Sequence, residues 1–406
     1  METGSIVVPE KRQLRTRRTQ QSGKQQEGGQ KATGHQAATT KNYFQCTVNA
    51  GVSKSNIILT GSRLLDLLLL AVVAAVVLAL AGGSPLWIFI LSALGLIPLA
   101  AVLGAATDLL AERLGPLAAG ILQSTLGNAS ELILAIVALR AGLLEIVKAS
   151  LTGSIISNLL LVLGLAMLFG GLRFERQTVN KSIAASNATM LFLAAVGLVV
   201  PAVFAWSVGG APGAAAGIEH LSLWTAGVLI VLYGISLCFQ LRLARRTGRV
   251  QASGRRGGVA VQLLAAVILI ALLSELLVHE LHIAQAAFHG TDLFWGGVVF
   301  ALIGNAAEHG VAVIAALHND MDLAMAIGAG SSLQIALLLA PALVFISLLL
   351  GHPMTLVFTG IEVVAVVLST VMVGMIAADG ETNWLEGSQL VAVYIILVVG
   401  FYFVPL

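Results

Sequence analysis

Two glutamates stand out because each lies in the middle of a long apolar run. Glu131 ends the stretch Gly127-Asn-Ala-Ser-Glu131, and Glu308 ends the similar stretch Gly304-Asn-Ala-Ala-Glu308. A charged group at the centre of a bilayer costs roughly 2.5–3.5 kcal/mol on insertion scales, so an acid there indicates a function. Two facing carboxylates can hold a dehydrated divalent cation, or protons in its place. We therefore predict that Glu131 and Glu308 form one cation site.

Neutral polar residues near the two acids could complete such a site. Calcium prefers about six to eight oxygen ligands from carboxylates, carbonyls and water. Gly127 and Gly304 permit local unwinding of the helix, which would make backbone carbonyls available to the ion. The candidate supporting groups, which could instead serve as helix-packing residues, are Asn128, Asn305, Ser154, Ser157, Asn158, Ser331, Ser332, Gln334 and His309.

A buried ion pair does not explain the two acids, because neither apolar run contains Lys or Arg. Without a bound ion, the closeness of two like charges and their removal from water favour protonated carboxyl groups. Such a pair takes up protons in coupled steps. Cation and protons would then compete for the same oxygens, and this competition is a basis for exchange.

The rest of the chain predicts a multi-pass membrane protein. It is 58% hydrophobic and only 10% charged, whereas a soluble domain is about 25% charged. At about 20 apolar residues per membrane helix, about eleven spans fit into the chain. The expected spans are 64–81, 86–111, 117–139, 146–170, 183–206, 221–241, 259–283, 293–317, 323–350, 356–377 and 388–404.

The two glutamate motifs belong to an internal repeat whose offset is 304 − 127 = 177 residues. The same offset pairs Gly153-Ser154 with Gly330-Ser331. If the first of the expected spans stands apart, the remaining ones divide into two sets of five. Because each set crosses the membrane an odd number of times, the second set is inserted upside down relative to the first. Inverted repeats place a substrate site near the membrane midplane. We therefore expect an all-α polytopic fold with one N-terminal helix and two inverted five-helix repeats.

The predicted organisation has five parts: a basic tail (1–63), a first helix (64–85), a first repeat (86–241), a basic linker (242–258) and a second repeat (259–406). The polar tail is expected to be disordered and to anchor the topology rather than bind nucleic acid. Lys and Arg gather in the loops of one side, which places the N-terminus in the cytoplasm and the C-terminus outside. A prokaryotic plasma membrane is the expected location, and the oligomeric state is left open.

Three further acids are candidates for the vestibules of an ion pathway. Asp108 and Glu275 lie upstream of the two motifs in related contexts, Thr-Asp-Leu-Leu and Ser-Glu-Leu-Leu. Glu362 lies several residues inside its expected span. The alternative for the first two is an interfacial helix end, and for Glu362 a structural role.

The motifs also resemble those of the Ca²⁺/H⁺ antiporters, the CAX branch of the calcium/cation antiporter superfamily. Residues 127–131 followed by 148–164 resemble the first repeat of that family, and residues 304–309 with 330–334 resemble the second. The resemblance extends over most of residues 64–406. It implies an eleven-helix fold in which Glu131 and Glu308 are the exchange-site carboxylates. It also implies Ca²⁺ and H⁺ as transported substrates, with no cofactor.

Other interpretations are weaker. His279 and His282 flank a glutamate, but they are three residues apart, whereas a zinc-binding HExxH pattern needs a spacing of about four. An enzyme is therefore not expected. A passive channel would not need a proton-binding carboxylate pair. The prediction is a secondary active transporter that exchanges Ca²⁺ for H⁺ by alternating access, with H⁺-coupled antiport of Mn²⁺, Na⁺ or K⁺ as the alternative.

Overall fold

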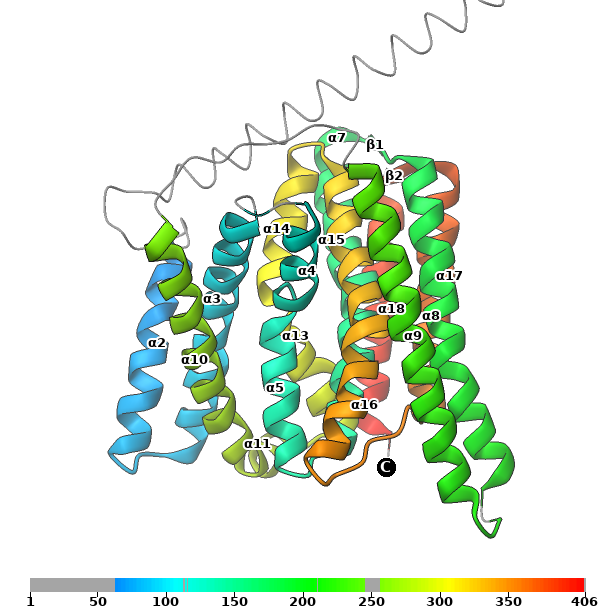
Figure 1. Ribbon diagram of the computed structural model, residues 1–406. Coiled ribbons are helices and arrows are strands. Elements are labelled where there is room, and N and C mark those ends of the chain that lie inside the picture. Colours follow the sequence, from blue (N-terminus) through cyan, green and yellow to red (C-terminus); the bar gives the residue numbers. More distant parts are fainter. Residues whose placement is uncertain (1–62, 112–113, 115, 210, 245–255, 405–406) are drawn as a thin grey trace, which may run out of the picture. The chain divides into compact units, whose positions relative to one another are not determined.

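The computed structural model describes residues 63–111, 114, 116–209, 211–244 and 256–404. Residues 1–62 of the predicted tail and most of the predicted linker lie outside these residues. The described chain is helical except for short connections and one two-stranded ladder (Figure 1). The α-helices are α2 (Arg63–Leu80), α3 (Pro85–Ala111), α4 (Pro116–Leu126), α5 (Ala129–Arg140), α6 (Leu144–Ile156), α7 (Leu163–Phe174), α8 (Lys181–Val208), α9 (Ala214–Ala244), α10 (Arg256–His279), α11 (Leu281–Phe288), α12 (Asp292–Phe294), α13 (Ala301–Gly304), α14 (Ala306–Leu317), α15 (Met321–Gln334), α16 (Ala340–Leu349), α17 (Gly360–Asp379) and α18 (Trp384–Phe403).

Three π-helical segments join α-helices into longer runs. They are η1 (Ser157–Val162) between α6 and α7, η2 (Trp295–Phe300) between α12 and α13, and η3 (Ile335–Leu339) between α15 and α16. Counting these runs as single helices, eight helices among the described residues are long and apolar enough to cross a membrane. The chain is thus a multi-pass membrane protein, as its composition predicts.

The helices that carry the two glutamate motifs are broken at the motifs. Asn128 separates α4 from α5 with φ −107° and ψ 32°, and Asn305 separates α13 from α14 with φ −94° and ψ 5°. The expected spans 117–139 and 293–317 are therefore each two shorter helices. Because neither half is long enough to cross a bilayer alone, the count of eleven spans stays a prediction.

The expected span 259–283 is also interrupted. Helix α10 ends at His279, and α11 follows as a separate short helix. Helix α11 and the run from Asp292 to Gly304 form a pair bent by 114°. The chain thus turns sharply before it enters the second motif.

The two broken helices run in opposite directions. Along the chain, α4 leads down to α5, whereas α13 leads up to α14 (Figure 1). Helix α6 packs on η2, α3 on α10, and α17 on α8. The approach of α6 to η2 requires glycine, because a Cβ on Gly153 would lie 2.0 Å from the carbonyl oxygen of Gly297.

At the end of the bundle where α7 stops, the ladder joins two loops. Strand β1 (Arg176–Thr178) pairs antiparallel with β2 (Glu381–Asn383), with Gln177 opposite Thr382. Gln177 is buried, and its Nε2 donates to the carbonyl oxygen of Ala316 at 2.8 Å and to Asn319 Oδ1 at 3.1 Å. The ladder therefore connects the loop after α7 to the C-terminal end of α14, the helix that begins beside Glu308.

Candidate cation-binding site

The two glutamates occupy equivalent places in their helices. Glu131 is the third residue of α5 and Glu308 the third residue of α14. The N-terminal end of a helix carries a partial positive charge, which favours an anionic side chain there. Glu131 is only 8% exposed, and Glu308 is partly buried. Helix breaks in both motifs thus place two carboxylates at two helix N-termini inside the bundle.

The Asn128 amide lies between these carboxylates. With its nitrogen turned towards the acids, it can donate to Glu131 Oε2 at 3.2 Å and to Glu308 Oε1 at 3.2 Å. Its oxygen then lies 2.8 Å from the Gln334 amide oxygen Oε1, and the Gln334 amide must turn as well to donate to it. The same Asn128 nitrogen is 2.9 Å from Ser331 Oγ. A single amide group therefore bridges the acids, and the two carboxylates are at most two hydrogen-bond lengths apart.

Gly304 of the second motif packs closely against Glu131. A Cβ on this glycine would lie 2.7 Å from Glu131 Cγ, so only glycine fits without displacing the acid. The Gly304 carbonyl oxygen also accepts a hydrogen bond from Ser130 Oγ at 3.3 Å. The two motifs, far apart in sequence, thus interlock at the backbone of Gly304.

Buried amides and hydroxyls form a hydrogen-bonded network next to the acids. Asn305 Nδ2 donates to Ser154 Oγ at 2.8 Å and to the Ala301 carbonyl oxygen at 2.8 Å. Asn158 Nδ2 donates to Asn305 Oδ1 at 3.0 Å and to Ser331 Oγ at 3.0 Å. The network therefore joins α6 and η1 to the second motif and to α15.

Three oxygens at this site have no hydrogen-bond partner among the described residues. They are Glu131 Oε1, Glu308 Oε2 and Asn158 Oδ1, and all three are buried. Most buried polar atoms in proteins are hydrogen-bonded, so three such oxygens in one place can ligate a cation. The described residues hold no cluster of three or more His, Cys, Asp or Glu. A cation here would depend on carboxylate, amide, hydroxyl, carbonyl and water oxygens, the donors that suit Ca²⁺.

Other predicted site residues differ in what they contact. Ser157 Oγ and His309 Nε2 are 3.3 Å apart at the edge of the network. Ser332 Oγ donates to the backbone carbonyls of Gly328 and Ile155, so this hydroxyl holds helices together. Gly127 stands at the break before α5, where a Cβ would lie 3.3 Å from Gln334 Oε1.

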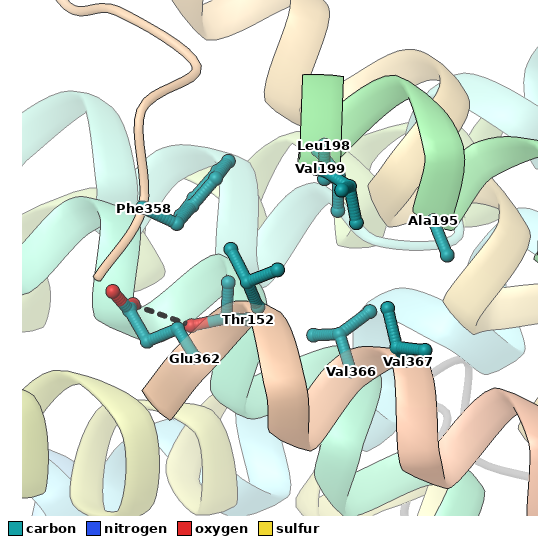
Figure 2. A pocket seen from close by; sticks show the side chains of 9 residues that line it. Thr152, Ala195, Leu198, Val199, Phe358, Glu362, Val366 and Val367 are labelled. Atoms are coloured by element: carbon teal, nitrogen blue, oxygen red, sulfur yellow. Dashed lines mark hydrogen bonds between the residues drawn. The ribbon is translucent and has the colours of Figure 1, made fainter. Parts of the chain in front are cut away.

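The three predicted vestibule acids have three different environments. Asp108 Oδ1 accepts a hydrogen bond from Gln123 Nε2 of α4 at 2.9 Å. Glu275 is exposed on α10. Their roles in an ion pathway stay predictions. Glu362, in contrast, is only 2% exposed and hydrogen-bonded to Thr152 between α17 and α6 (Figure 2).

Sequence reasoning missed Ser130 and Thr152. Ser130 lies inside the first motif, but its counterpart in the second is an alanine, so the repeat gave no signal for it. Thr152 precedes Gly153-Ser154, and its contact with Glu362 crosses 210 positions of sequence. Neither contact could be found from local patterns.

The fold and the site define a helical membrane protein in which two carboxylates lie close together at the breaks of two helices. The model of the family described as sodium/calcium exchanger protein matches residues 84–242 and 258–403. The chain therefore belongs to the sodium/calcium exchanger protein family.

Relatives that are 40% identical to this chain are Ca²⁺/H⁺ antiporters. This confirms the resemblance to the Ca²⁺/H⁺ antiporters that the motifs predict. The chain is 40% identical over 339 residues to a Ca(2+)/H(+) antiporter of Aphanothece halophytica, covering 78% of this chain and 90% of the relative. It is 40% identical over 346 residues to the Ca(2+)/H(+) antiporter ChaA of Bacillus subtilis, covering 82% and 97%.

Two solved structures have a similar fold. The structure of native YfkE superposes with a TM-score of 0.74 at 38% identity and covers 84% of this chain and 100% of that one. The crystal structure of the H+/Ca2+ exchanger CAX gives a TM-score of 0.65 at 15% identity, covering 82% and 87%. The latter likeness concerns the fold alone.

Proposed function

We propose that this protein is a secondary active transporter that exchanges Ca²⁺ for H⁺ across a membrane by alternating access. The observation that carries the proposal is the pair of glutamates, each with one buried oxygen that lacks a hydrogen-bond partner among the described residues. Relatives that are Ca²⁺/H⁺ antiporters at 40% identity support the choice of ions.

The charge of the site explains why exchange would be coupled. Ionised Glu131 and Glu308 together carry two negative charges in a region of low dielectric, where uncompensated charge is costly. A bound Ca²⁺ neutralises them, and so do protons on both carboxyls. The site with two ionised carboxylates and no bound ion has the highest free energy of the three states. Ca²⁺ is therefore released only as protons bind, and protons are released only as Ca²⁺ binds. Antiport follows from this exclusion of the empty state.

The architecture supports alternating access. The two broken helices run in opposite directions (Figure 1), as an inverted pair of repeats requires. We propose two inverted five-helix repeats after an N-terminal helix, eleven spans in all, as counted from the apolar runs. Under the same proposal the N-terminus is cytoplasmic, the C-terminus is outside, and the protein resides in a prokaryotic plasma membrane.

Transport by purified protein in liposomes tests the proposal. With an imposed pH gradient, the wild type should accumulate Ca²⁺, and Ca²⁺ added on one side should release protons from the other. Glu131→Gln and Glu308→Gln should each abolish this exchange, because an amide neither ionises nor binds a proton. Asp379→Asn, at an exposed site at the end of α17, is the matched control. Full exchange in both glutamine variants would refute the proposal.

Transport assays with a panel of cations test which cation is exchanged for H⁺. Mn²⁺, Na⁺ and K⁺ should each be tested as the driven ion and as competitors of Ca²⁺. We expect the half-saturating concentration for transport to be lowest for Ca²⁺, since the donors at the site include the hard oxygens of two acids. Saturation with counterflow would distinguish a carrier from a channel.

A further inference from the structure

Glu362 is a buried carboxylate outside the cation site, and both of its oxygens accept hydrogen bonds. Its Oε2 accepts from the backbone nitrogen of Thr359 at 2.8 Å and from Thr359 Oγ1 at 2.8 Å. The bond from the Thr359 nitrogen, together with the bond from the Glu362 backbone nitrogen to Thr359 Oγ1 at 3.5 Å, forms a capping box at the start of α17. Glu362 Oε1 accepts from Thr152 Oγ1 of α6 at 2.8 Å (Figure 2). One oxygen therefore caps its own helix while the other reaches a second helix.

The surroundings of Glu362 do not suit an ion pathway. The pocket beside it is lined mainly by apolar residues of α8 and α17, with Phe358 above and Thr152 next to the carboxylate (Figure 2). The nearby acid Glu145 is paired with Lys148 at 2.9 Å. Because both oxygens of Glu362 already accept from N–H and O–H groups, they offer a cation few vacant positions. The carboxylate thus serves as a hydrogen-bond acceptor between helices.

Helix α6 is held on two sides at consecutive residues. Thr152 contacts Glu362 of α17. Gly153 packs directly on the backbone of Gly297 in η2, with no room for a Cβ. The next residue, Ser154, accepts the hydrogen bond from Asn305 inside the cation site. A displacement of α6 at Thr152 would therefore be transmitted within one helical turn to the network beside the acids.

We propose that Glu362 is a positioning residue for the cation site. Through Thr152 it holds α6 against η2, and in this way it fixes the distance between Ser154 and Asn305. The inference rests on the proposed function only in that the site it positions is the one that binds Ca²⁺. It requires a side chain at position 362 that accepts from Thr359 and forms a hydrogen bond with the hydroxyl at position 152, but no negative charge.

Ca²⁺ binding to the purified full chain, measured by equilibrium radioisotope binding, tests the inference without transport. Glu362→Ala and Thr152→Val each remove one partner of a buried hydrogen bond, and such losses change equilibria by about tenfold or more. Both variants should raise the Ca²⁺ concentration for half-saturation by about tenfold. In liposomes the same shift should appear in the apparent KM, while the maximal rate per folded protein stays within about twofold of wild type.

The conservative variants should rescue binding. In Glu362→Gln the amide oxygen can accept from Thr359, and its nitrogen can donate to Thr152 Oγ1. The Thr152 hydroxyl can then donate to the Ala149 carbonyl oxygen, which is 3.1 Å away. Thr152→Ser keeps the hydroxyl. Both variants should bind Ca²⁺ within about threefold of wild type, because the hydrogen bonds persist.

A second capping box provides a control that distinguishes an effect on the geometry of the cation site from a loss of helix stability. Glu386 Oε2 accepts from the backbone nitrogen of Asn383 at the start of α18, in the same arrangement as Glu362 and Thr359. Glu386→Ala should lower the thermal midpoint without changing Ca²⁺ affinity.

Two results would overturn the inference. One is a Glu362→Gln variant as defective as Glu362→Ala, since charge would then be required. The other is Ca²⁺ affinity unchanged in both Glu362→Ala and Thr152→Val. Retained exchange in the glutamine variants of Glu131 and Glu308 would instead refute the proposed function, whatever the result at Glu362.

Discussion

Replacing Gly304 by alanine gives a sharp test of how closely the two motifs approach each other. Gly304 ends α13 and does not have a positive φ. The backbone therefore tolerates alanine, which in a helix is more favourable than glycine by about 0.5–1 kcal/mol. The added methyl group, however, would lie 2.7 Å from Glu131 Cγ and 3.7 Å from Glu131 Oε1. Steric displacement of the acid decides the outcome.

The expected loss of Ca²⁺ affinity follows from the distance between the added Cβ and Glu131 Cγ. Ordinary van der Waals contact begins at 3.4 Å, so Cβ and Cγ must separate by 3.4 − 2.7 = 0.7 Å. Glu131 is 8% exposed and has little space to move. Ca²⁺ is held at about 2.3–2.6 Å from its ligands, and functional groups must be held within about 0.5 Å. Misplacement by about 1 Å costs up to about 100-fold in function. We expect Gly304→Ala to raise the half-saturating Ca²⁺ concentration by about 10- to 100-fold.

Equilibrium Ca²⁺ binding and Ca²⁺ uptake into liposomes under a pH gradient measure this change. Gly310→Ala is the matched control, because Gly310 lies in α14 and a Cβ there would meet nothing within 4 Å. The control should bind and transport Ca²⁺ like the wild type. If Gly304→Ala matched Gly310→Ala in both assays, the approach of Gly304 to Glu131 would not matter for cation binding.

Two other predictions concern stability. Gly153 and Gly330 are equivalent in the repeat, but a Cβ meets the Gly297 carbonyl oxygen at 2.0 Å in the first case and nothing within 4 Å in the second. Gly153→Ala should therefore lose most of its monodisperse protein in size-exclusion chromatography while Gly330→Ala keeps it, and equal yields would contradict the α6–η2 packing. Gln177→Leu leaves the Ala316 carbonyl oxygen without its side-chain donor, at a cost of about 1–3 kcal/mol. It should lower the thermal midpoint while exchange persists, and an unchanged midpoint would show that this hydrogen bond is dispensable.

The sequence identifies the residues that meet at the candidate site, because acids in apolar runs have few alternative explanations. Glu131, Glu308, Asn128 and Asn305 are recognisable from type and spacing, and the structure brings all four together. The sequence predicts local unwinding at Gly127 and Gly304, and both helices break directly after these glycines, at Asn128 and Asn305. The expected span 356–377 places Glu362 inside a helix, whereas α17 begins at Gly360 and Glu362 lies in its first turn.

Long-range contacts could not be predicted in the same way. Gln177 looks like a loop residue, and only the ladder with β2 and the end of α14 make it buried. The π-helical segments share no distinctive composition, since Ser157–Val162 begins with two polar residues whereas Ile335–Leu339 is entirely apolar. The burial of Glu362 depends on Thr152, a partner on a different helix. Tertiary packing, rather than local preference, decides each of these cases.

The ladder of β1 and β2 makes the two ends of the protein unequal. The 177-residue offset places the counterpart of β1 in the segment 353–355, between α16 and α17, and this segment has no strand. Under the proposed alternating access, a transporter built from two related halves would otherwise have two end states of similar free energy. The end that carries the ladder would have to break these extra hydrogen bonds, or move them as a unit, in each rearrangement. The resting population would therefore favour one of the two forms, and the two half-cycles of turnover would proceed at different rates under equal ion gradients.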